Sequence, residues 1–491
     1  MDKWAEQGQT FAMRLIIPLI LVLGLGSCEL PDRAVPPVRK SRELVVLTRN
    51  SPSTYYEDAQ GNYAGLEYDL VNLFAKELGV SVKFVVVPEF NKIIPTLARK
   101  QAHLAAAGLT VTPGRVKIVR FGPAYQTIQP QVVYNGLSLK PAAFQDLLGK
   151  KIEVVAGSSY VERLNQAKKQ FPKLAWHEVT SVEIEELLEK IAGGEVDCSI
   201  ADSHLIAMAQ NFFPDLGVAF NVGEPEHLAW AFPKDGDPYL FDKAQEFFSR
   251  IEKDGTLRRL LDRYYGHIER LNHIDVVSFL DKLDSTLPSY RKLFQKAQET
   301  SEIDWRLIAA LGYQESHWDP FATSPTGVRG LMMLTADTAD HLGVGNRLDP
   351  KENIPAGAGY FLTLKESLPE RIPEPDRTWI ALAAYNAGLG HIEDARVLAQ
   401  KNKLNPDSWT DLKKALPLLS KAAYHAELKH GYARGGEAVI FVETIRTYYD
   451  IMLKFEKPYK SPYPGLSAAE EALSLAASPA RPDKGAKPKA R

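Results

Sequence analysis

Glu315 lies at the end of a helical pattern that begins near Ile303 and stops before Pro320. Leu307, Leu311 and Glu315 are spaced at four-residue intervals, so they share one face of the predicted helix. An apolar face raises the pKa of a carboxyl group toward the range that suits a general acid. On this helix alone, a solvated Glu at a frayed end is the better interpretation, because most Glu side chains lie at protein surfaces.

Further groups of residues follow Glu315 in order and change this interpretation. Ser316 comes next, then residues 318–322 with the sequence WDPFA, then Gly330–Met333, and then Ala383–Gly388 with the sequence AAYNAG. This ordered set resembles the soluble lytic transglycosylase domain, a lysozyme-like helical fold, over roughly residues 288–455. The resemblance implies an enzyme that acts on peptidoglycan glycan strands and needs neither cofactor nor metal.

The motifs supply one candidate carboxylate, whereas most glycosidases need two. Asp319 stands just before Pro320 and is expected to order a turn, and Asp304 lies about 16 Å from Glu315 along the helix. The resemblance implies that Glu315 is both acid and base in a cleavage between N-acetylmuramic acid and N-acetylglucosamine that forms a 1,6-anhydro sugar. A muramidase that uses the same Glu with water is one alternative, and a ligand-sensing lipoprotein with a degenerate helical domain is another.

The resemblance also implies a set of residues that bind the glycan. They are Ser316, Gly330, Leu331, Met333, Tyr385, Asn386 and Tyr448. Ser316 could instead cap the helix, and Tyr385 could instead pack in the core. The chain departs from the family where Met333 replaces a common Gln, and where Tyr448 stands one position beyond the commonest spacing of the last tyrosine.

The first half of the chain alternates between strand-like and helix-like segments. Strands are expected at 44–47, 80–87, 104–109, near 152–155 and at 196–201, and helices at 66–78, 92–99, 160–171 and 183–191. This alternation predicts an α/β domain with a mostly parallel sheet, arranged as two lobes with a cleft between them.

Four motifs in this half resemble the family 3 bacterial solute-binding proteins over roughly residues 43–268. They are Gly65–Leu70, Gly108–Arg115, Phe121–Tyr125 and Val196–Asp202. The resemblance implies a periplasmic-binding-protein-like fold and an amino-acid or muropeptide-like ligand. Because this domain is fused to the predicted enzyme, we expect ligand binding to regulate the enzyme.

The same resemblance assigns roles in ligand binding. Arg115 is expected to hold a ligand carboxylate, since a guanidinium forms paired hydrogen bonds with that group. Asp202 is expected to take the ligand ammonium, and Thr110 also to contact the ligand. Ser158 and Ser159 lie between a strand and a helix, where backbone N–H groups receive anions. Taken singly, Arg115 and Asp202 also fit a surface charge and a helix cap.

The N-terminal residues resemble a bacterial lipoprotein signal. Residues 1–27 end in an apolar run and Leu25-Gly26-Ser27, followed by Cys28. The pattern implies cleavage before Cys28, lipidation of Cys28 and attachment to the periplasmic face of the outer membrane, with residues 29–42 as a tether. The other cysteine, Cys198, lies in an apolar strand and is expected to be a buried thiol.

The whole chain of 491 residues is therefore expected to hold several domains. A net charge of −2 gives no sign of a nucleic-acid partner. Residues 269–287 are expected to form a linker with a short helix, residues 288–455 an all-α domain, and residues 467–491 a disordered tail. Helices are expected at 288–301, 303–316, 335–342, 354–368, 376–387, 410–415 and 434–455.

Overall fold

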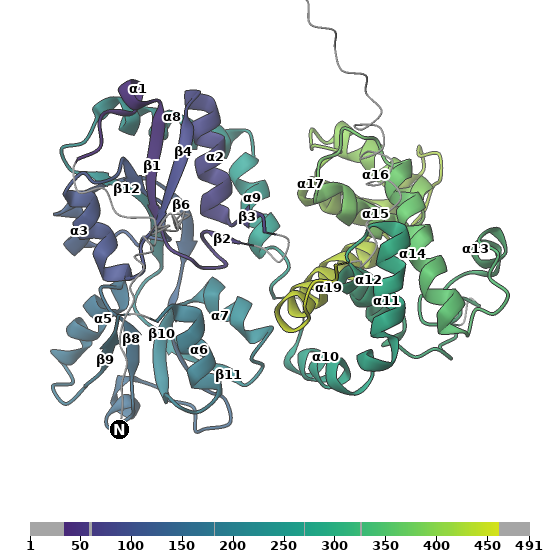
Figure 1. Cartoon of the computed structure of the whole chain (residues 1–491), viewed down its shortest axis with the longest axis horizontal. Coiled ribbons are helices and arrows are strands. Elements are labelled where there is room, and N and C mark those ends of the chain that lie inside the picture. The colour runs from purple at the N-terminus through teal and green to yellow at the C-terminus, as the bar shows by residue number, and fades with distance from the viewer. Residues whose placement is uncertain (1–33, 58–60, 181, 270, 325–326, 461–491) are drawn as a thin grey trace, which may run out of the picture.

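A computed structural model describes residues 34–57, 61–180, 182–269, 271–324 and 327–460. An α/β body of two lobes is followed by a body built of helices (Figure 1), so the predicted fold class is confirmed. The predicted signal peptide, the lipidation at Cys28 and the disordered tail lie outside the described residues. No helix in the described part of the chain is long and apolar enough to cross a membrane.

The first lobe is built on a five-stranded sheet in the order β4-β1-β5-β12-β6. Its strands are β1 (Glu43–Thr48), β4 (Ser81–Val86), β5 (Leu104–Ala105), β6 (Val119–Ile128) and β12 (Glu226–Pro233), with the small pair β2 (Tyr56–Glu57) and β3 (Tyr63–Ala64) beside it. Its helices are α1 (Val38–Ser41), α2 (Leu66–Leu78), α3 (Ile93–Ala98), α4 (Pro113–Val116), α8 (Pro238–Lys253) and α9 (Thr256–Tyr265).

The second lobe contains a three-stranded sheet in the order β10-β7-β11 and a two-stranded pair. Its strands are β7 (Pro130–Asn135), β8 (Glu153–Val155), β9 (His177–Val179), β10 (Cys198–Asp202) and β11 (Leu216–Asn221), and its helices are α5 (Ser159–Lys168), α6 (Ile184–Ala192) and α7 (Ser203–Gln210). The chain passes between the lobes from β6 to β7 and again from β11 to β12, so two adjacent connections form the hinge. Cys198 is buried and free, as predicted.

The prediction of a mostly parallel sheet is wrong. β1 pairs in parallel with β4 and β5, but β12 runs antiparallel to β5 and β6, and β7 runs antiparallel to β10 and β11. The strands missed from the sequence are the short β2, β3 and β9 and the four strands next to the hinge, β6, β7, β11 and β12. In β6 and β7, Gly122, Pro123 and Pro130 interrupt the strand pattern, and such residues are typical of turns.

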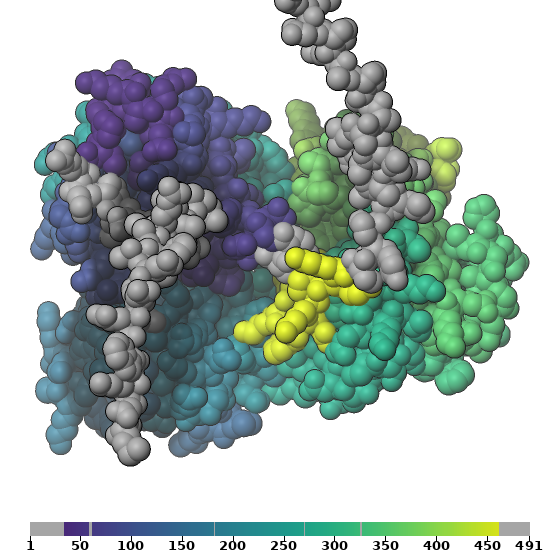
Figure 2. Space-filling model, viewed as in Figure 1, coloured from purple at the N-terminus to yellow at the C-terminus, as the bar shows by residue number. Residues whose placement is uncertain are grey.

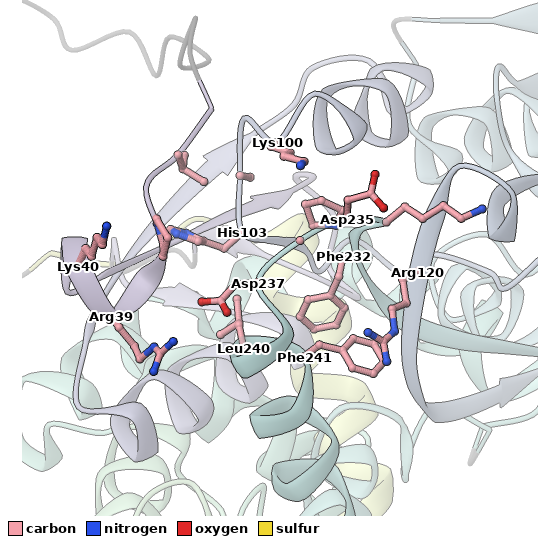
Figure 3. Close-up of a pocket in the computed structure, with 16 residues that line it drawn as sticks. Arg39, Lys40, Lys100, His103, Arg120, Phe232, Asp235, Asp237, Leu240 and Phe241 are labelled. Atoms are coloured by element: carbon pink, nitrogen blue, oxygen red, sulfur yellow. The ribbon is translucent and has the colours of Figure 1, made fainter.

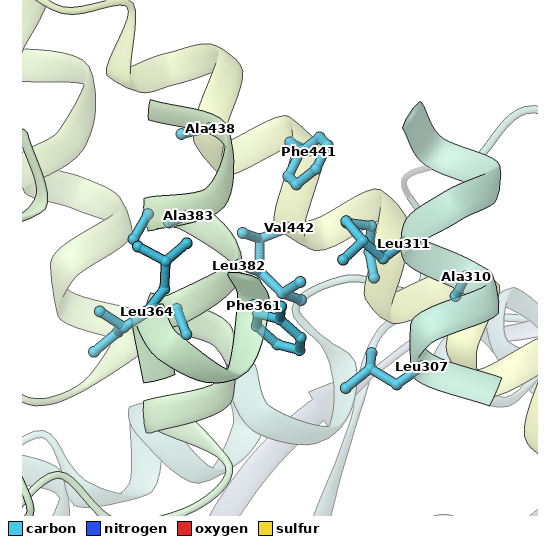
Figure 4. Packing of buried hydrophobic residues seen from close by; sticks show 14 of the residues in the cluster. Leu307, Ala310, Leu311, Phe361, Leu364, Leu382, Ala383, Ala438, Phe441 and Val442 are labelled. Atoms are coloured by element: carbon cyan, nitrogen blue, oxygen red, sulfur yellow. The ribbon is translucent and has the colours of Figure 1, made fainter. Parts of the chain in front are cut away.

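The helical body contains α10 (His273–Ser285), α11 (Leu287–Ser301), α12 (Trp305–Ser316), α13 (Ala336–His341), α14 (Pro350–Ser367), α15 (Asp376–Ala387), α16 (Leu389–Lys401), α17 (Trp409–Ala415), α18 (Ala422–His425) and α19 (Gly435–Phe455). One hydrophobic core joins all of these helices except α13 and α18, and α12 lies at its centre with every residue from Trp305 to Tyr313 buried. In Figure 4, Leu307 and Leu311 point from α12 toward Phe361 and Val442. A helix buried on all sides is expected to be apolar around its circumference, and in this stretch Arg306, which pairs with Asp304, is the one charged residue.

The segment expected to be a linker carries α10, and α10 is part of this core. Phe279 is fully buried and Leu283 nearly so, both in the cluster that holds α12. The helices expected from residue 288 onward are present, and α16 and the short α18 are additions.

The start of α16 was hidden by glycines. Gly388 and Gly390 flank Leu389, the first residue of α16, and such a pair of glycines is typical of the end of a helix rather than the start of another.

Candidate catalytic and ligand-binding sites

The end of α12 is fixed by its own backbone and by Trp318. His317 adopts a left-handed conformation with φ of 52°, and its N–H donates to the carbonyl oxygen of Tyr313 at 2.7 Å. The indole N–H of Trp318, which is buried, donates to the carbonyl oxygen of Ala309 at 2.8 Å. The chain therefore turns back at once after Ser316, and Glu315 stays in the last helical turn.

Glu315 is partly exposed at the edge of the core. Burial raises the pKa of its carboxyl group to about 8, and in the described part of the chain no other charged group contributes to this shift. The carboxyl group is therefore largely protonated at neutral pH and is ready to give up a proton. Asp304 instead caps the first turn of α12 and pairs with Arg306 at 2.6 Å, and Asp319 orders a turn by accepting from the N–H of Phe321.

Side chains from α12, α14 and α15 hold the loop Gly330–Met333 in place. The amide oxygen of Asn353 on α14 accepts from the N–H of Met332 at 2.6 Å. The hydroxyl of Tyr385 on α15 donates to the carbonyl oxygen of Met332 at 2.8 Å. The Ser316 hydroxyl lies 2.8 Å from the carbonyl oxygen of Leu331 and 3.2 Å from that of Gly312. The loop is thus positioned through its backbone.

Only one of the four loop residues presents a side chain toward the surface. Gly330 has φ of +81°, and a Cβ atom there would lie 1.9 Å from the carbonyl oxygen of Arg347, so the position requires glycine. The side chains of Leu331 and Met332 are fully buried in the core. Met333 has φ of +48° and is partly exposed. Contacts of Leu331 with a sugar would therefore have to come from its backbone.

Tyr385 belongs to a group that also contains Tyr360 and Glu315. The rings of Tyr360 on α14 and Tyr385 lie 5.3 Å apart, and burial followed by the nearby Glu315 raises the pKa of the Tyr385 hydroxyl well above its usual range. Asn386, the next residue, is exposed at the end of α15. Sequence reasoning missed Tyr360 and Asn353, because each is a lone residue in an ordinary helical pattern and belongs to no motif.

We expect Tyr385→Phe to lower cleavage about tenfold to a hundredfold. The substitution leaves the carbonyl oxygen of Met332 without its donor, and an unsatisfied buried acceptor costs about 1–3 kcal/mol. The loop beside Glu315 then loses one of its three attachments. Rates of sacculus digestion, compared with thermal unfolding, test this. Tyr424→Phe, an exposed tyrosine on α18, is the matched control and should leave both unchanged. A Tyr385→Phe variant with the wild-type rate would show that the hydroxyl does not position the loop.

Tyr448 is not brought together with Glu315. Its buried ring packs on Phe279 at 4.4 Å and on Tyr313 at 4.9 Å. Tyr313 and Glu315 are two residues apart and therefore about 200° apart around α12. Tyr448 thus lies on the side of α12 away from Glu315. Burial, followed by the nearby Asp304, raises the pKa of the Tyr449 hydroxyl. Asp304 lies at the opposite end of α12 from Glu315, so Tyr449 is not beside Glu315 either.

The five residues expected to bind a ligand in the first domain line one small cavity between the lobes. They are Thr110, Arg115, Ser158, Ser159 and Asp202. All five are buried, and the cavity is also lined by Arg49, Phe90 and Tyr160, which sequence reasoning missed. Arg49 follows the carboxyl end of β1, where parallel strands place binding residues, and that position was an available signal.

Several polar atoms in this cavity have no partner in the described structure. They include Oδ1 of Asp202, the hydroxyl of Ser158 and Nε of Arg49. Burial raises the pKa of Asp202 to about 6, so its carboxyl group is mostly ionised at neutral pH. The guanidinium of Arg115 donates to the carbonyl oxygens of Thr110 and Gly157, each at 2.9 Å. A buried cation and a buried anion with free hydrogen-bonding capacity suit a zwitterion.

The lobes are closed on each other. The cavity measures about 20 Å³, roughly the space of one water molecule. Direct contacts join the lobes, including the ion pair of Arg49 with Glu183 at 3.5 Å and the hydrogen bond from Ser51 to Glu185 at 2.5 Å. A ligand the size of an amino acid can therefore enter only if the lobes move apart.

Helix α9 joins the first domain to the helical body. Asp262 pairs with Lys413 of α17 at 2.6 Å and accepts a hydrogen bond from Thr410 at 2.8 Å. Arg446 of α19 donates to the carbonyl oxygen of Arg263 at 2.7 Å. Figure 2 shows the yellow atoms near the end of α19 between the two bodies.

Both lobes reach this junction. The hydroxyl of Tyr265, at the end of α9, donates to the carbonyl oxygen of Ser53 in the first lobe, and its ring packs edge-on against His204 of the second lobe. Also from the second lobe, the ring of Phe213 lies 4.4 Å from the ammonium of Lys454 on α19. Because α19 packs directly against α12, the lobes and the helix that carries Glu315 are in continuous contact.

Comparisons with known proteins agree with both halves of the chain. The model of bacterial extracellular solute-binding proteins, family 3, matches residues 44–267, and that of the transglycosylase SLT domain matches residues 292–407. Among solved structures, an arginine-binding protein mutant from T. maritima is 23% identical with a TM-score of 0.43, covering 47% of this chain and 97% of that one. An ancestral arginine-binding protein bound to arginine is 25% identical with a TM-score of 0.41, covering 45% and 98%.

Relatives that match this chain over most of its length include three proteins with the same name. The membrane-bound lytic murein transglycosylase F of Methylobacillus flagellatus is 50% identical over 460 residues, which cover 93% of this chain and 98% of the relative. That of Nitrosospira multiformis is 51% identical over 471 residues, which cover 95% and 98%. That of Pseudomonas putida F1 is 44% identical over 439 residues, which cover 89% and 90%. The chain therefore belongs to the membrane-bound lytic murein transglycosylase F family, peptidoglycan lyases with a solute-binding domain.

Proposed function

We propose that Glu315 carries out the lytic reaction alone, first as the acid and then as the base. Its carboxyl proton passes to the oxygen that links C1 of N-acetylmuramic acid to N-acetylglucosamine, and the C1–O bond breaks. The resulting carboxylate takes the proton of the muramoyl 6-hydroxyl, and that oxygen bonds to C1. The 1,6-anhydro ring closes without water. The observation that carries this proposal is the pKa of about 8, caused by burial alone.

The other motif residues divide into three groups in this proposal. We assign Met333, Tyr385 and Asn386 to glycan binding, and the effect of Glu315 on the pKa of the Tyr385 hydroxyl supports this assignment for Tyr385. Gly330 and Leu331 are part of the loop Gly330–Met333, and Ser316 helps to hold this loop in place, which its contact with the carbonyl oxygen of Leu331 supports. Tyr448 is assigned to core packing, which its ring contacts support.

The pH profile of cleavage tests the role of Glu315. We expect kcat/KM to fall about tenfold per pH unit above pH 8, because only the protonated carboxyl starts the reaction, and to show no loss from this group at lower pH. Initial rates of sacculus digestion, measured from about pH 5 to about pH 10, supply the profile. The control Asp319→Asn, at an exposed turn residue, should keep the same basic limb. A decline that already begins near pH 5, roughly the usual range of Glu, would contradict the assignment.

We also propose that the first domain, residues 43–268, binds an amino acid or a muropeptide-like ligand and regulates the catalytic domain, residues 288–455. Arg115 would take the ligand carboxylate and Asp202 the ammonium. The unpartnered atoms in the closed cavity support a zwitterionic ligand. Tyr265 contacts both lobes, which supports the proposal that closure of the lobes on a ligand changes the position of α9 and, through it, of α19.

Arg115→Ala should weaken ligand binding at least about thirtyfold, because truncating one partner of a buried charge pair costs about 2–5 kcal/mol. Calorimetry with free amino acids and with muropeptides measures the loss. Lys117→Ala, an exposed neighbour, serves as the control and should bind like the wild type. In the same samples, any ligand that changes the rate of digestion should lose its effect in Arg115→Ala. A response that persists in the variant would place regulation elsewhere.

For the N-terminus we propose signal cleavage after residue 27, lipidation of Cys28 and attachment to the periplasmic face of the outer membrane. The membrane-bound relatives support this placement. Cys28→Ala should move the protein from the membrane fraction to the soluble periplasmic fraction. A variant that stays with the outer membrane would point to a different attachment.

A further inference from the structure

A large basic pocket lies on the first lobe, away from the ligand cavity. Its volume is about 600 Å³, and its walls come from residues 35–40, residues 100–103, Arg120 and residues 232–241. Figure 3 shows Arg39 and Lys40 on one side and Arg120 on the opposite side. No step of the reaction and no part of the proposed ligand site uses it.

The pocket carries more positive than negative charge. Five cations line it: Arg39, Lys40, Lys100, Arg120 and Lys234. All five are exposed, and none of them forms a salt bridge with a carboxylate in the described part of the chain. Two carboxylates, Asp235 and Asp237, also line the pocket, so the excess is three positive charges. Burial lowers the pKa of His103, so this ring adds no charge at neutral pH.

The floor of the pocket is apolar and rigid. Phe232, Leu240 and Phe241 are buried in the sheet and in α8. The guanidinium of Arg120 lies 3.3 Å from the centre of the Phe241 ring, which holds this cation at the mouth. Oδ2 of Asp237 is buried and has no partner in the described structure. The pocket thus offers cations for a phosphate and one free acceptor for a hydroxyl or ammonium group attached to it.

The pocket lies where the predicted lipid anchor enters the domain. Val35 forms part of its wall and follows Cys28 by seven residues, which span at most about 25 Å. The N–H of Val35 donates to the carbonyl oxygen of Lys100 at 2.8 Å, and the His103 ring bonds the carbonyl oxygen of Pro36 at 2.8 Å. Two bonds therefore fix the base of the tether to the pocket wall, so an anchored chain keeps this pocket close to the lipid surface.

We propose that this pocket binds the phosphate of an anionic phospholipid headgroup and so sets the orientation of the first lobe on the membrane. The phosphate lies among the five cations, and the headgroup hydroxyl or ammonium meets Asp237. The lipid on Cys28 supplies attachment, and the pocket supplies a second contact.

Vesicle binding by the mature full-length chain tests the proposal, with Cys28→Ser so that no attached lipid dominates. Vesicles of phosphatidylcholine alone are compared with vesicles of equal parts phosphatidylcholine and phosphatidylglycerol. We expect binding only to the second kind. Lys40→Gln, Lys100→Gln and Lys234→Gln together should weaken it about a hundredfold, at about fivefold per charge. The matched control removes three exposed lysines elsewhere, Lys169, Lys173 and Lys421, and should bind like the wild type.

Equal loss in the pocket variant and the control variant would overturn the proposal, because binding would then reflect overall charge. No binding to either vesicle would overturn it as well. Titration with soluble glycerophosphoglycerol and with inorganic phosphate shows whether the bound phosphate belongs to a membrane lipid or to a free molecule. If these ligands bind at the three lysines while vesicles do not, the site takes a free phosphate and the membrane role is wrong. Thermal unfolding of both triple variants shows that the fold is retained.

Discussion

Glu315→Gln should abolish sacculus digestion, by at least about a thousandfold, while leaving the protein folded. A positioned acid or base contributes about 10²–10⁴ in rate, and Glu315 serves both half-reactions. Gln has the same shape and cannot donate or accept the proton. The wild-type carboxyl group is protonated in its buried setting at neutral pH, so the variant loses no buried ion pair.

Stability supplies a second readout for Glu315→Gln. The folded-state pKa is about 8 and the ordinary value is 4.5, so between these values the unfolded chain has released a proton that the folded chain retains. Wild-type stability therefore falls as pH rises through this window, and it does not fall for this reason below it. Glu315→Gln removes that dependence. Thermal unfolding of both proteins at pH values across the window measures it, and Asp319→Asn is the control for both readouts. Substantial digestion by Glu315→Gln would mean that another group is the acid.

Glu443→Ala should lower the free energy of unfolding by about 3–5 kcal/mol. Glu443 is fully buried in α19, where it accepts from the indole N–H of Trp409 at 2.6 Å and from Arg446 at 3.1 Å, with Lys413 at 3.3 Å. Removing one partner of a buried ion pair leaves the other charge without compensation, at about this cost. Arg446 also holds the carbonyl oxygen of Arg263, so the junction with α9 should weaken too.

Urea unfolding followed by circular dichroism tests the role of Glu443. The matched control is Glu437→Ala on the same helix, where an exposed Glu pairs with an exposed Arg434. Exposed pairs contribute about 0–1 kcal/mol, so this variant should unfold almost like the wild type. A loss for Glu443→Ala no larger than that of the control would show that the buried network does not stabilise the junction.

The sequence was a good guide where pattern and local structure agree. The helix that carries Glu315 begins at Trp305 and ends at Ser316, within two residues of the expected bounds, because a continuous apolar pattern and an abrupt polar stop define it. The five expected ligand residues line one cavity, because each follows a strand or opens a helix next to the hinge. Motif order was enough to place them, although they are up to 92 positions apart, from Thr110 to Asp202.

Residues whose roles depend on tertiary contacts could not be predicted from the sequence. Asn353 and Tyr360 carry no local signal of their roles, since each depends on a partner distant in sequence. Tyr448 was chosen by its spacing from Glu443, but the side of α12 that it meets depends on how α19 packs. Among the antiparallel strands beside the hinge, β6 and β7 were missed because proline and glycine interrupt their pattern.

Mass spectrometry of the muropeptides released from sacculi in water labelled with heavy oxygen tests the central claim most directly. Glu315 as sole acid and base predicts 1,6-anhydromuramoyl ends that contain no oxygen from the solvent. Reducing ends that carry the heavy oxygen would show that water attacks C1, and would contradict cleavage by a single carboxyl group with the substrate's own hydroxyl.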